Sequence, residues 1–144
     1  MKYSKPILAA ATAFLTATTG QFASADEIWD SATGLIIYEV DSFGDAVFSF
    51  TSYNGAKANL IIEGFASQLD DRGTNQGYWI GEDGLDCKAT LSHPGGYSGT
   101  KWGRAVVVWD KKTFPSAFTM TTGDCFGEPQ VSLEAEPTVR KLSD

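Results

Sequence analysis

Histidine, cysteine and basic residues are scarce in this chain. It contains one His, two Cys and 11 Lys or Arg residues against 18 Asp or Glu residues, which gives a formal net charge of −7. Zinc sites and Ser-His-Asp triads are poorly supported, because His93 is the only imidazole and no nucleophile elbow occurs. The setting of His93 in LSHPGG predicts a solvent-exposed loop residue. Nucleic acid is an unsuitable partner, since its phosphates are neutralised by Lys and Arg side chains.

Acidic residues are absent from the N-terminal segment. Lys2 and Lys5 precede an apolar run over 7–19 that is shorter than the roughly 20 residues of a membrane-spanning helix. An Ala-Ser-Ala sequence follows, so residues 1–25 are predicted to be a cleaved secretory signal peptide. Cleavage removes two of the 11 basic and none of the 18 acidic residues, which leaves 119 residues of formal charge −9. We expect a periplasmic or secreted protein whose surface attracts cationic partners.

The two cysteines, Cys87 and Cys125, both follow the predicted signal peptide. In an exported chain, such a pair is predicted to form a disulfide. Loop entropy assigns roughly 4 kcal/mol to a bridge across this separation. The pair lacks the close spacing of redox or metal-binding cysteines.

After the signal, β-branched and aromatic residues alternate with polar ones, and Gly, Pro, Asn and Asp separate the runs. Eight strands are predicted at 34–40, 46–53, 58–64, 76–81, 85–91, 104–110, 116–122 and 130–135. This pattern indicates an all-β fold, a small antiparallel β-barrel or sandwich of about eight strands with one disulfide. Up-and-down order and a barrel are favoured, because connections are short and closure removes exposed sheet edges. We expect one domain over 26–136 and a flexible tail over 137–144.

Strand periodicity also predicts which side chains face the interior. Phe48 and Phe50 share one face of the second strand, and Trp109 shares a face with Ala105 and Val107. The long segment SHPGGYSGTKWG, with four Gly and one Pro, is predicted to be a loop that is able to carry binding residues.

Aromatic residues are concentrated near this loop, and aromatic rings in clefts bind sugars, apolar molecules or cations. Tyr78 and Trp79 are adjacent in a strand and should face opposite sides of the sheet, whereas Trp102 is expected to be partly exposed. The candidate binding residues are Tyr78, Trp79, Tyr97, Ser98, Lys101 and Trp102.

Acidic loops raise two alternatives. A carboxylate-based hydrolase would need two acids in one cleft, drawn from residues such as Asp70, Asp83 and Asp86. Calcium is an alternative ligand for Asp70, Asp71 and Asn75, although the EF-hand spacing is absent. Hydrated turns explain the same residues, so we assign no catalytic residues and no cofactor.

Two short segments resemble known families. Ser98-Gly-Thr-Lys-Trp102 resembles the S-G-x-x-Y loop of bacterial c-type lysozyme inhibitors, with Trp in place of Tyr and no second Y-x-x-x-K-G element. This resemblance implies a periplasmic barrel that inserts the loop into the lysozyme cleft, with Ser98 and Lys101 as contacts. Residues 29–34 are similar to the W-x-N-x-x-G-S start of avidin-like barrels, but Ser31 and Leu35 replace the two polar groups expected to bind biotin.

Together these observations favour an exported, non-enzymatic binding protein that engages a protein or small ligand outside the cytoplasm. A cationic protein such as lysozyme is one expected partner on grounds of charge. The alternative is a barrel that binds a small molecule or glycan in an aromatic pocket.

Overall fold

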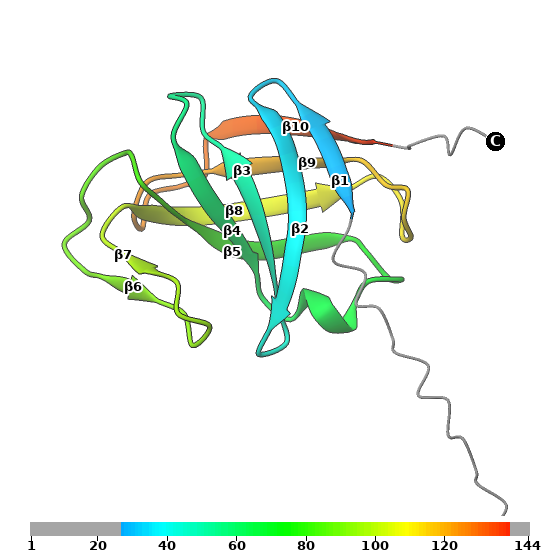
Figure 1. Ribbon diagram of the computed structural model, residues 1–144, viewed down its shortest axis with the longest axis horizontal. Helices are drawn as coiled ribbons and strands as arrows, with labels where there is room; N and C mark the ends of the chain where they lie inside the picture. The colour runs from blue at the N-terminus through cyan, green and yellow to red at the C-terminus, as the bar shows by residue number, and fades with distance from the viewer. Residues whose placement is uncertain (1–26, 139–144) are drawn as a thin grey trace, which may run out of the picture.

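The structure, a computed structural model, describes residues 27–138. Eight antiparallel strands form a closed barrel (Figure 1). They are β1 (Ile28–Ser31), β2 (Gly34–Ser42), β3 (Asp45–Thr51), β4 (Lys57–Ile62), β5 (Thr74–Gly81), β8 (Trp102–Trp109), β9 (Phe118–Thr122) and β10 (Val131–Pro137). Each strand pairs with the next one around the barrel, and β1 pairs with β10 to close it. The predicted all-β barrel in up-and-down order is therefore confirmed.

An insertion between β5 and β8 lies outside the barrel wall. Residues 82–101, which we call the arm, contain the two-stranded hairpin of β6 (Leu91–Ser92) and β7 (Ser98–Gly99). Figure 1 shows this hairpin beside the barrel. A second, smaller hydrophobic cluster lies between the arm and the outer face of the barrel, formed by Val47, Ile61, Tyr78, Ile80, Cys87, Leu91, Tyr97, Trp102 and Cys125.

The inward-facing residues of the strands form the main core. Phe48 and Phe50 are buried there, as are Ala105, Val107 and Trp109, which confirms the two predicted faces. Alternation places every second side chain of a strand inside a closed barrel, so these residues pack against the opposite wall.

One predicted strand was wrong, and one observed strand was not predicted. The segment 85–91 forms no strand before Leu91, because it leaves the barrel wall to begin the arm. The eighth barrel strand is instead β1, which was not among the predicted strands. Four residues containing Asp and Ser give little β signal of their own, and β1 is held by pairing with β2 on one side and β10 on the other. The predicted long loop, residues 92–103, also contains Ser92 of β6, the whole of β7 and the start of β8.

One end of the barrel, here called the plugged end, is closed by Arg72. Its guanidinium donates hydrogen bonds to the Leu69 carbonyl at 2.8 Å, Ser116 Oγ at 2.9 Å and Glu27 Oε1 at 2.6 Å. It also lies 4.8 Å from the ring centroid of Trp109. The 3₁₀ helix η1 (Phe65–Ser67) belongs to the same end. These contacts satisfy a buried cation with acceptors and an aromatic ring.

Both chain ends extend beyond the described residues. The predicted signal peptide over 1–25 and residues 139–144 of the predicted tail lie outside the described residues. Pro137 belongs to β10, and the Thr138 N–H donates to the Ile28 carbonyl at 2.8 Å. Within residues 27–138, no helix has the length and apolar character that crossing a membrane requires.

Candidate binding site

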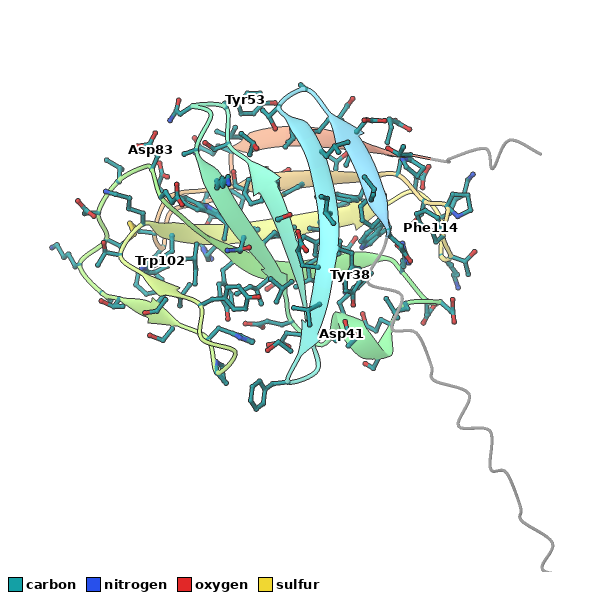
Figure 2. The ribbon with its side chains drawn as sticks, viewed as in Figure 1. Tyr38, Asp41, Tyr53, Asp83, Trp102 and Phe114 are labelled. Atoms are coloured by element: carbon teal, nitrogen blue, oxygen red, sulfur yellow. A yellow bond between two sulfur atoms is a disulfide. The ribbon has the colours of Figure 1, made fainter. Side chains whose placement is uncertain are left out.

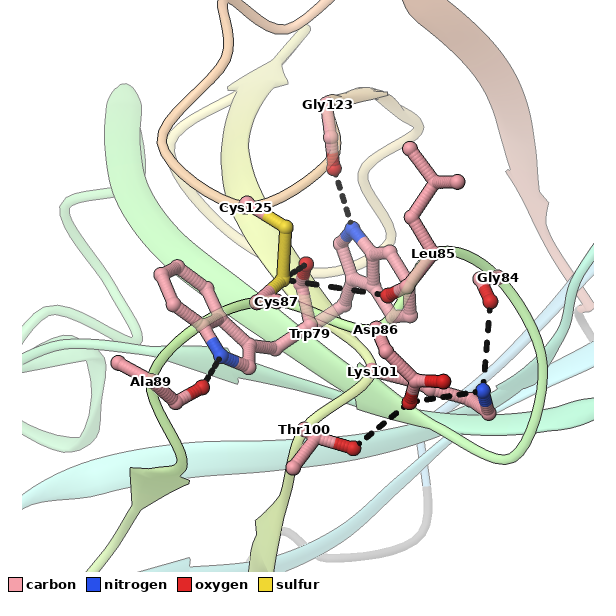
Figure 3. The surroundings of a disulfide bond; sticks show 11 residues. Trp79, Gly84, Leu85, Asp86, Cys87, Ala89, Thr100, Lys101, Gly123 and Cys125 are labelled. Atoms are coloured by element: carbon pink, nitrogen blue, oxygen red, sulfur yellow. Dashed lines mark hydrogen bonds and ion pairs between the residues drawn. A yellow bond between two sulfur atoms is a disulfide. The ribbon is translucent and has the colours of Figure 1, made fainter.

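Trp79 lies at the other end of the barrel, the open end, where the β3–β4 turn, the arm and the β9–β10 loop meet. Its indole faces the interior and is only 9% exposed, whereas Tyr78 faces the outer cluster under the arm. The predicted opposite orientation of these neighbours is confirmed. The indole Nε1 donates a hydrogen bond to the Gly123 carbonyl at 2.8 Å (Figure 3). A buried indole N–H needs such a partner, so this bond fixes the orientation of the ring.

Glycines surround this indole. A Cβ added at Gly81 would lie 3.1 Å from a ring carbon of Trp79, and one at Gly84 would lie 3.2 Å from another. At Gly103 the added Cβ would be 2.6 Å from Trp79 Nε1 and 1.7 Å from the Gly123 carbonyl oxygen. The ring therefore occupies space that only the absence of these side chains provides.

A cavity of about 370 Å³ opens at this end of the barrel. We call it the mouth cavity. Its inward-facing apolar lining residues are Phe50, Ala58, Trp79, Met120 and Leu133. Its exposed lining residues include Tyr53, Lys57, Glu82, Asp83, Asp124 and Glu128. Figure 2 labels Tyr53 and Asp83 on two of the loops at this end. An apolar hollow with a polar rim, in this size range, is the usual form of a small-molecule site.

The predicted disulfide is confirmed and joins two walls of the mouth cavity. Cys87 in the arm is bonded to Cys125 in the β9–β10 loop. Within the arm, Asp86 joins its beginning to its end, because it accepts hydrogen bonds from Lys101 Nζ at 3.0 Å and Thr100 Oγ1 at 2.9 Å (Figure 3). Hydrogen bonding by Lys101, followed by that of Thr100, lowers the pKa of the exposed Asp86 carboxyl. The mouth loops are therefore cross-linked to each other.

A second hollow of about 600 Å³ lies outside the barrel, between the outer face of β2 to β5 and the arm. Tyr97 and Ser98 line it from the arm, opposite polar side chains of the wall. Among these, Ser49 Oγ donates to Glu39 Oε1 at 2.6 Å, and Asn59 lies on the neighbouring strand. We call this hollow the outer groove.

The six candidate binding residues do not form one site. Trp79 lines the mouth cavity, and Tyr97 and Ser98 line the outer groove. Tyr78 is partly buried under the arm, where burial, followed by the negative charges of Asp45 and Glu63, raises its pKa to about 12. The remaining two residues, Lys101 and Trp102, are engaged in contacts within the protein.

The expected exposure of Trp102 is wrong. Its side chain is 4% exposed, and its Nε1 donates to the Ala89 carbonyl at 2.8 Å. It packs edge-on against Phe126, with ring centroids 4.9 Å apart. The arm folds back over the start of β8 and covers this ring. Consequently, in the segment that resembles the lysozyme-inhibitor loop, the aromatic side chain is in a hydrophobic cluster and Lys101 is paired with Asp86.

The expected exposure of His93 is also wrong, since it is 5% exposed. Its Nδ1 accepts a hydrogen bond from the Gly95 N–H at 3.0 Å, and its Nε2 lies 2.8 Å from Asp45 Oδ2. Because Nδ1 is an acceptor, the proton is on Nε2 and is donated to Asp45. His93 thus fastens the hairpin of the arm to the start of β3. The nearby serines bond to each other, with Ser92 Oγ and Ser98 Oγ 3.2 Å apart.

The acidic candidates are dispersed. Asp70 lies between η1 and β5 at the plugged end, whereas Asp83 and Asp86 lie in the arm at the open end, so Asp70 cannot pair with either across a cleft. Of the calcium candidates, Asp71 lies 3.6 Å from Lys112 Nζ, and the buried Asn75 donates to Gln68 Oε1 at 2.8 Å. Within the described chain, no three His, Cys, Asp or Glu side chains are grouped to hold a metal ion.

The avidin-like segment forms a hairpin, since β1 and β2 pair in antiparallel register. Ser31 Oγ donates to the Gly34 carbonyl at 2.7 Å within that turn, and Leu35 is exposed on the outer face. The two positions that would contact biotin are therefore a turn residue and an outward side chain. No known protein family, curated protein or solved structure matches this chain.

Proposed function

We propose that this chain is an exported, non-enzymatic binding protein that holds a small ligand with an apolar part in the mouth cavity. The observation that carries the proposal is the fixed indole of Trp79 in the wall of a 370 Å³ cavity whose inner lining is apolar. A rigid aromatic wall needs little reorganisation on binding, which lowers the entropic cost of complex formation.

The fold supports this assignment in a second way. Small eight-stranded barrels fill their interior with side chains or leave room for one small ligand. Here the plugged end is filled, and the open end retains a hollow that solvent reaches. The disulfide supports export, since such bonds persist in oxidising compartments.

Titration with the neutral fluorescent probe N-phenyl-1-naphthylamine tests the mouth cavity. We expect one probe to bind per chain, with a change in Trp79 emission that is lost in Trp79→Phe. Ala58→Leu should reduce probe affinity about tenfold or more, because the larger side chain projects into the cavity. Val108→Leu, a change at an exposed site on β8, is the control. Unchanged probe binding in Ala58→Leu would place the probe elsewhere and contradict the proposal.

A cationic protein such as lysozyme is the second candidate ligand. It is favoured by the formal charge of −9 after cleavage and by Phe126, which is 74% exposed beside the mouth. If lysozyme is the ligand, the mature protein should inhibit lysozyme at low salt, and Phe126→Ala should weaken this inhibition. If the mature protein does not bind lysozymes at low salt, lysozyme is not its ligand.

A glycan in the outer groove is a further candidate. Tyr97 supplies an aromatic face, and Ser49, Asn59 and Ser98 supply groups that hydrogen-bond to sugar hydroxyls. Binding of an oligosaccharide that is lost in Tyr97→Ala, with the neutral probe still bound at the mouth, would establish this site. Loss of both ligands together would contradict two separate sites.

A further inference from the structure

The rim of the mouth cavity is asymmetric in charge. Its lining contains one basic residue, Lys57, against four acidic ones. Glu128 is 3.2 Å from the guanidinium of Arg104 and is thereby compensated. Over residues 27–138, the other three acids, Glu82, Asp83 and Asp124, take part in no ion pair. The rim therefore carries excess negative charge directly above an apolar hollow.

These acids come from both walls that the disulfide joins. Glu82 and Asp83 follow β5 at the beginning of the arm, and Asp124 precedes Cys125 in the β9–β10 loop. Charges on opposite sides of a concave opening add their potentials within it, and low-dielectric walls focus that potential. A positive group at the opening is attracted from both sides.

An aromatic ring is held at the same rim. Tyr53 is exposed, and its hydroxyl donates to the Ser132 carbonyl at 2.7 Å, which ties the β3–β4 turn to β10. Phe50 and Trp79 continue the aromatic lining inward. Aromatic faces combined with carboxylates favour organic ammonium groups over hydrated metal ions, because the ring faces attract cations that carry apolar substituents.

From this combination we propose that the mouth cavity selects small organic cations, amines or quaternary ammonium compounds with an apolar body. The apolar body occupies the hollow lined by Met120 and Leu133, and the cationic group lies among the rim carboxylates. This proposal rests on the proposed function and specifies the class of ligand that the mouth cavity binds. Neutral molecules of the same shape bind more weakly, and anions are disfavoured.

A matched series of ligands tests the selection in the mature, disulfide-bonded protein. The series is 2-phenylethylammonium, 2-phenylethanol and phenylacetate, measured by calorimetry and by competition with N-phenyl-1-naphthylamine. If each uncompensated carboxylate contributes about twofold, the cation should bind about tenfold more tightly than the alcohol at low salt. The anion should bind more weakly than the alcohol. Added salt should reduce the differences in affinity among the three ligands.

Charge-neutralising variants locate the effect. The double variant Asp83→Asn and Asp124→Asn should reduce the preference for the cation to about twofold and leave the affinity for the alcohol unchanged. The amide introduced by Asp83→Asn retains an oxygen that accepts the Gly84 N–H, as Asp83 Oδ1 does at 2.8 Å, so the loop is preserved. The control is Asp70→Asn at the plugged end, for which the preference should remain near tenfold.

The outcomes separate the two proposals. Equal affinity for the cation and the alcohol, or a preference that survives the double variant, overturns selection by charge and leaves a neutral-ligand site in place. Failure of the cation to compete while the neutral probe binds overturns it as well. If the neutral probe itself does not bind at the mouth, the proposed function falls together with this inference.

Discussion

The two ends of the barrel use their interior in opposite ways. At the plugged end, large rings fill the space: Phe65 and Trp109 stack with centroids 5.2 Å apart, and Trp109 and Phe118 are 4.7 Å apart. At the open end, Trp79 is bordered by glycines, and a cavity of about 370 Å³ remains. One closed sheet thus combines a densely packed half with a hollow half.

This difference shows how a small domain combines stability with an open hollow. Dense packing and the buried ion pair concentrate the stabilising contacts at one end, so the loops at the other end tolerate an unfilled hollow. The open end is then held by local devices, namely the Cys87–Cys125 bridge and the Trp79 hydrogen bond. Rigid support beneath a site keeps its lining residues in binding geometry.

The largest expected effect is the loss of stability on replacing Arg72, compared with the loss on replacing Arg104. Each arginine forms an ion pair with a glutamate, and one such pair lies at each end of the barrel. In the Arg72–Glu27 pair the side chains are 1% and 11% exposed, whereas in the Arg104–Glu128 pair they are 46% and 81% exposed. Arg72→Met should lower the free energy of unfolding by about 3–5 kcal/mol, because it leaves a buried carboxylate unpaired. Arg104→Met should cost about 0–1 kcal/mol. Urea denaturation of both variants measures the difference.

A second substitution checks the cause of that loss. Adding Glu27→Gln to Arg72→Met removes the unpaired charge and should recover part of the lost stability. If Arg72→Met and Arg104→Met lower the free energy of unfolding by similar amounts, the ion pairs at the two ends do not differ in their contribution to stability.

Removal of the disulfide is expected to have the next largest effect. The double variant Cys87→Ser and Cys125→Ser opens a bridge with a sequence separation of 38, and we expect a loss of about 2–4 kcal/mol. Amide exchange in the native state should accelerate in the arm and over residues 123–130, and much less around Arg72. Equal acceleration at both ends would contradict a local role for the bridge. Probe affinity at the mouth should fall as well, since the bridge joins two of its walls.

A smaller effect is expected from adding one methyl group beside Trp79. In Gly81→Ala the new Cβ lies 3.1 Å from the indole ring and 3.2 Å from the Ala58 Cβ, so these groups must shift. We expect a loss of about 1 kcal/mol, a change in tryptophan emission and weaker probe binding. Gly73→Ala is the matched control, because no atom lies within 4 Å of its added Cβ and its stability should be unchanged or about 0.5 kcal/mol higher. If Gly81→Ala changes neither the stability, the tryptophan emission nor the probe binding, Trp79 is not closely confined.

The sequence predicted the barrel and its interior because those features depend on short-range periodicity. Alternation identified Phe48, Phe50 and Trp109 as inward-facing, and the composition of the chain predicted the Cys87–Cys125 bridge. The closure of the barrel by β1 was not predicted, because a four-residue strand is specified by its partners and not by its own residues.

The arm explains most of the errors at the candidate site. Trp102 was expected to be partly exposed because it lies where the predicted loop meets the next strand, but the arm covers it. His93 is buried through Asp45, which is 48 positions away in sequence. The orientation of Trp79 likewise depends on Gly123, which is 44 positions away. Such long-range contacts leave no periodic signal in one sequence, although the glycines close to Trp79, at positions 77, 81 and 84, are visible in it.

The smallest expected effect concerns the outer side of the wall that carries Trp79. Tyr78 has its pKa raised from 10.0 to about 12, first by burial under the arm and then by the charges of Asp45 and Glu63. In the unfolded chain this phenol ionises near pH 10, so its contribution to stability is complete below pH 10 and is lost as the pH rises through 12. Tyr78→Phe should therefore flatten the decline of the unfolding free energy between about pH 10 and 12, measured by urea titration. An unchanged decline in Tyr78→Phe would mean that the arm does not shield the Tyr78 phenol from solvent.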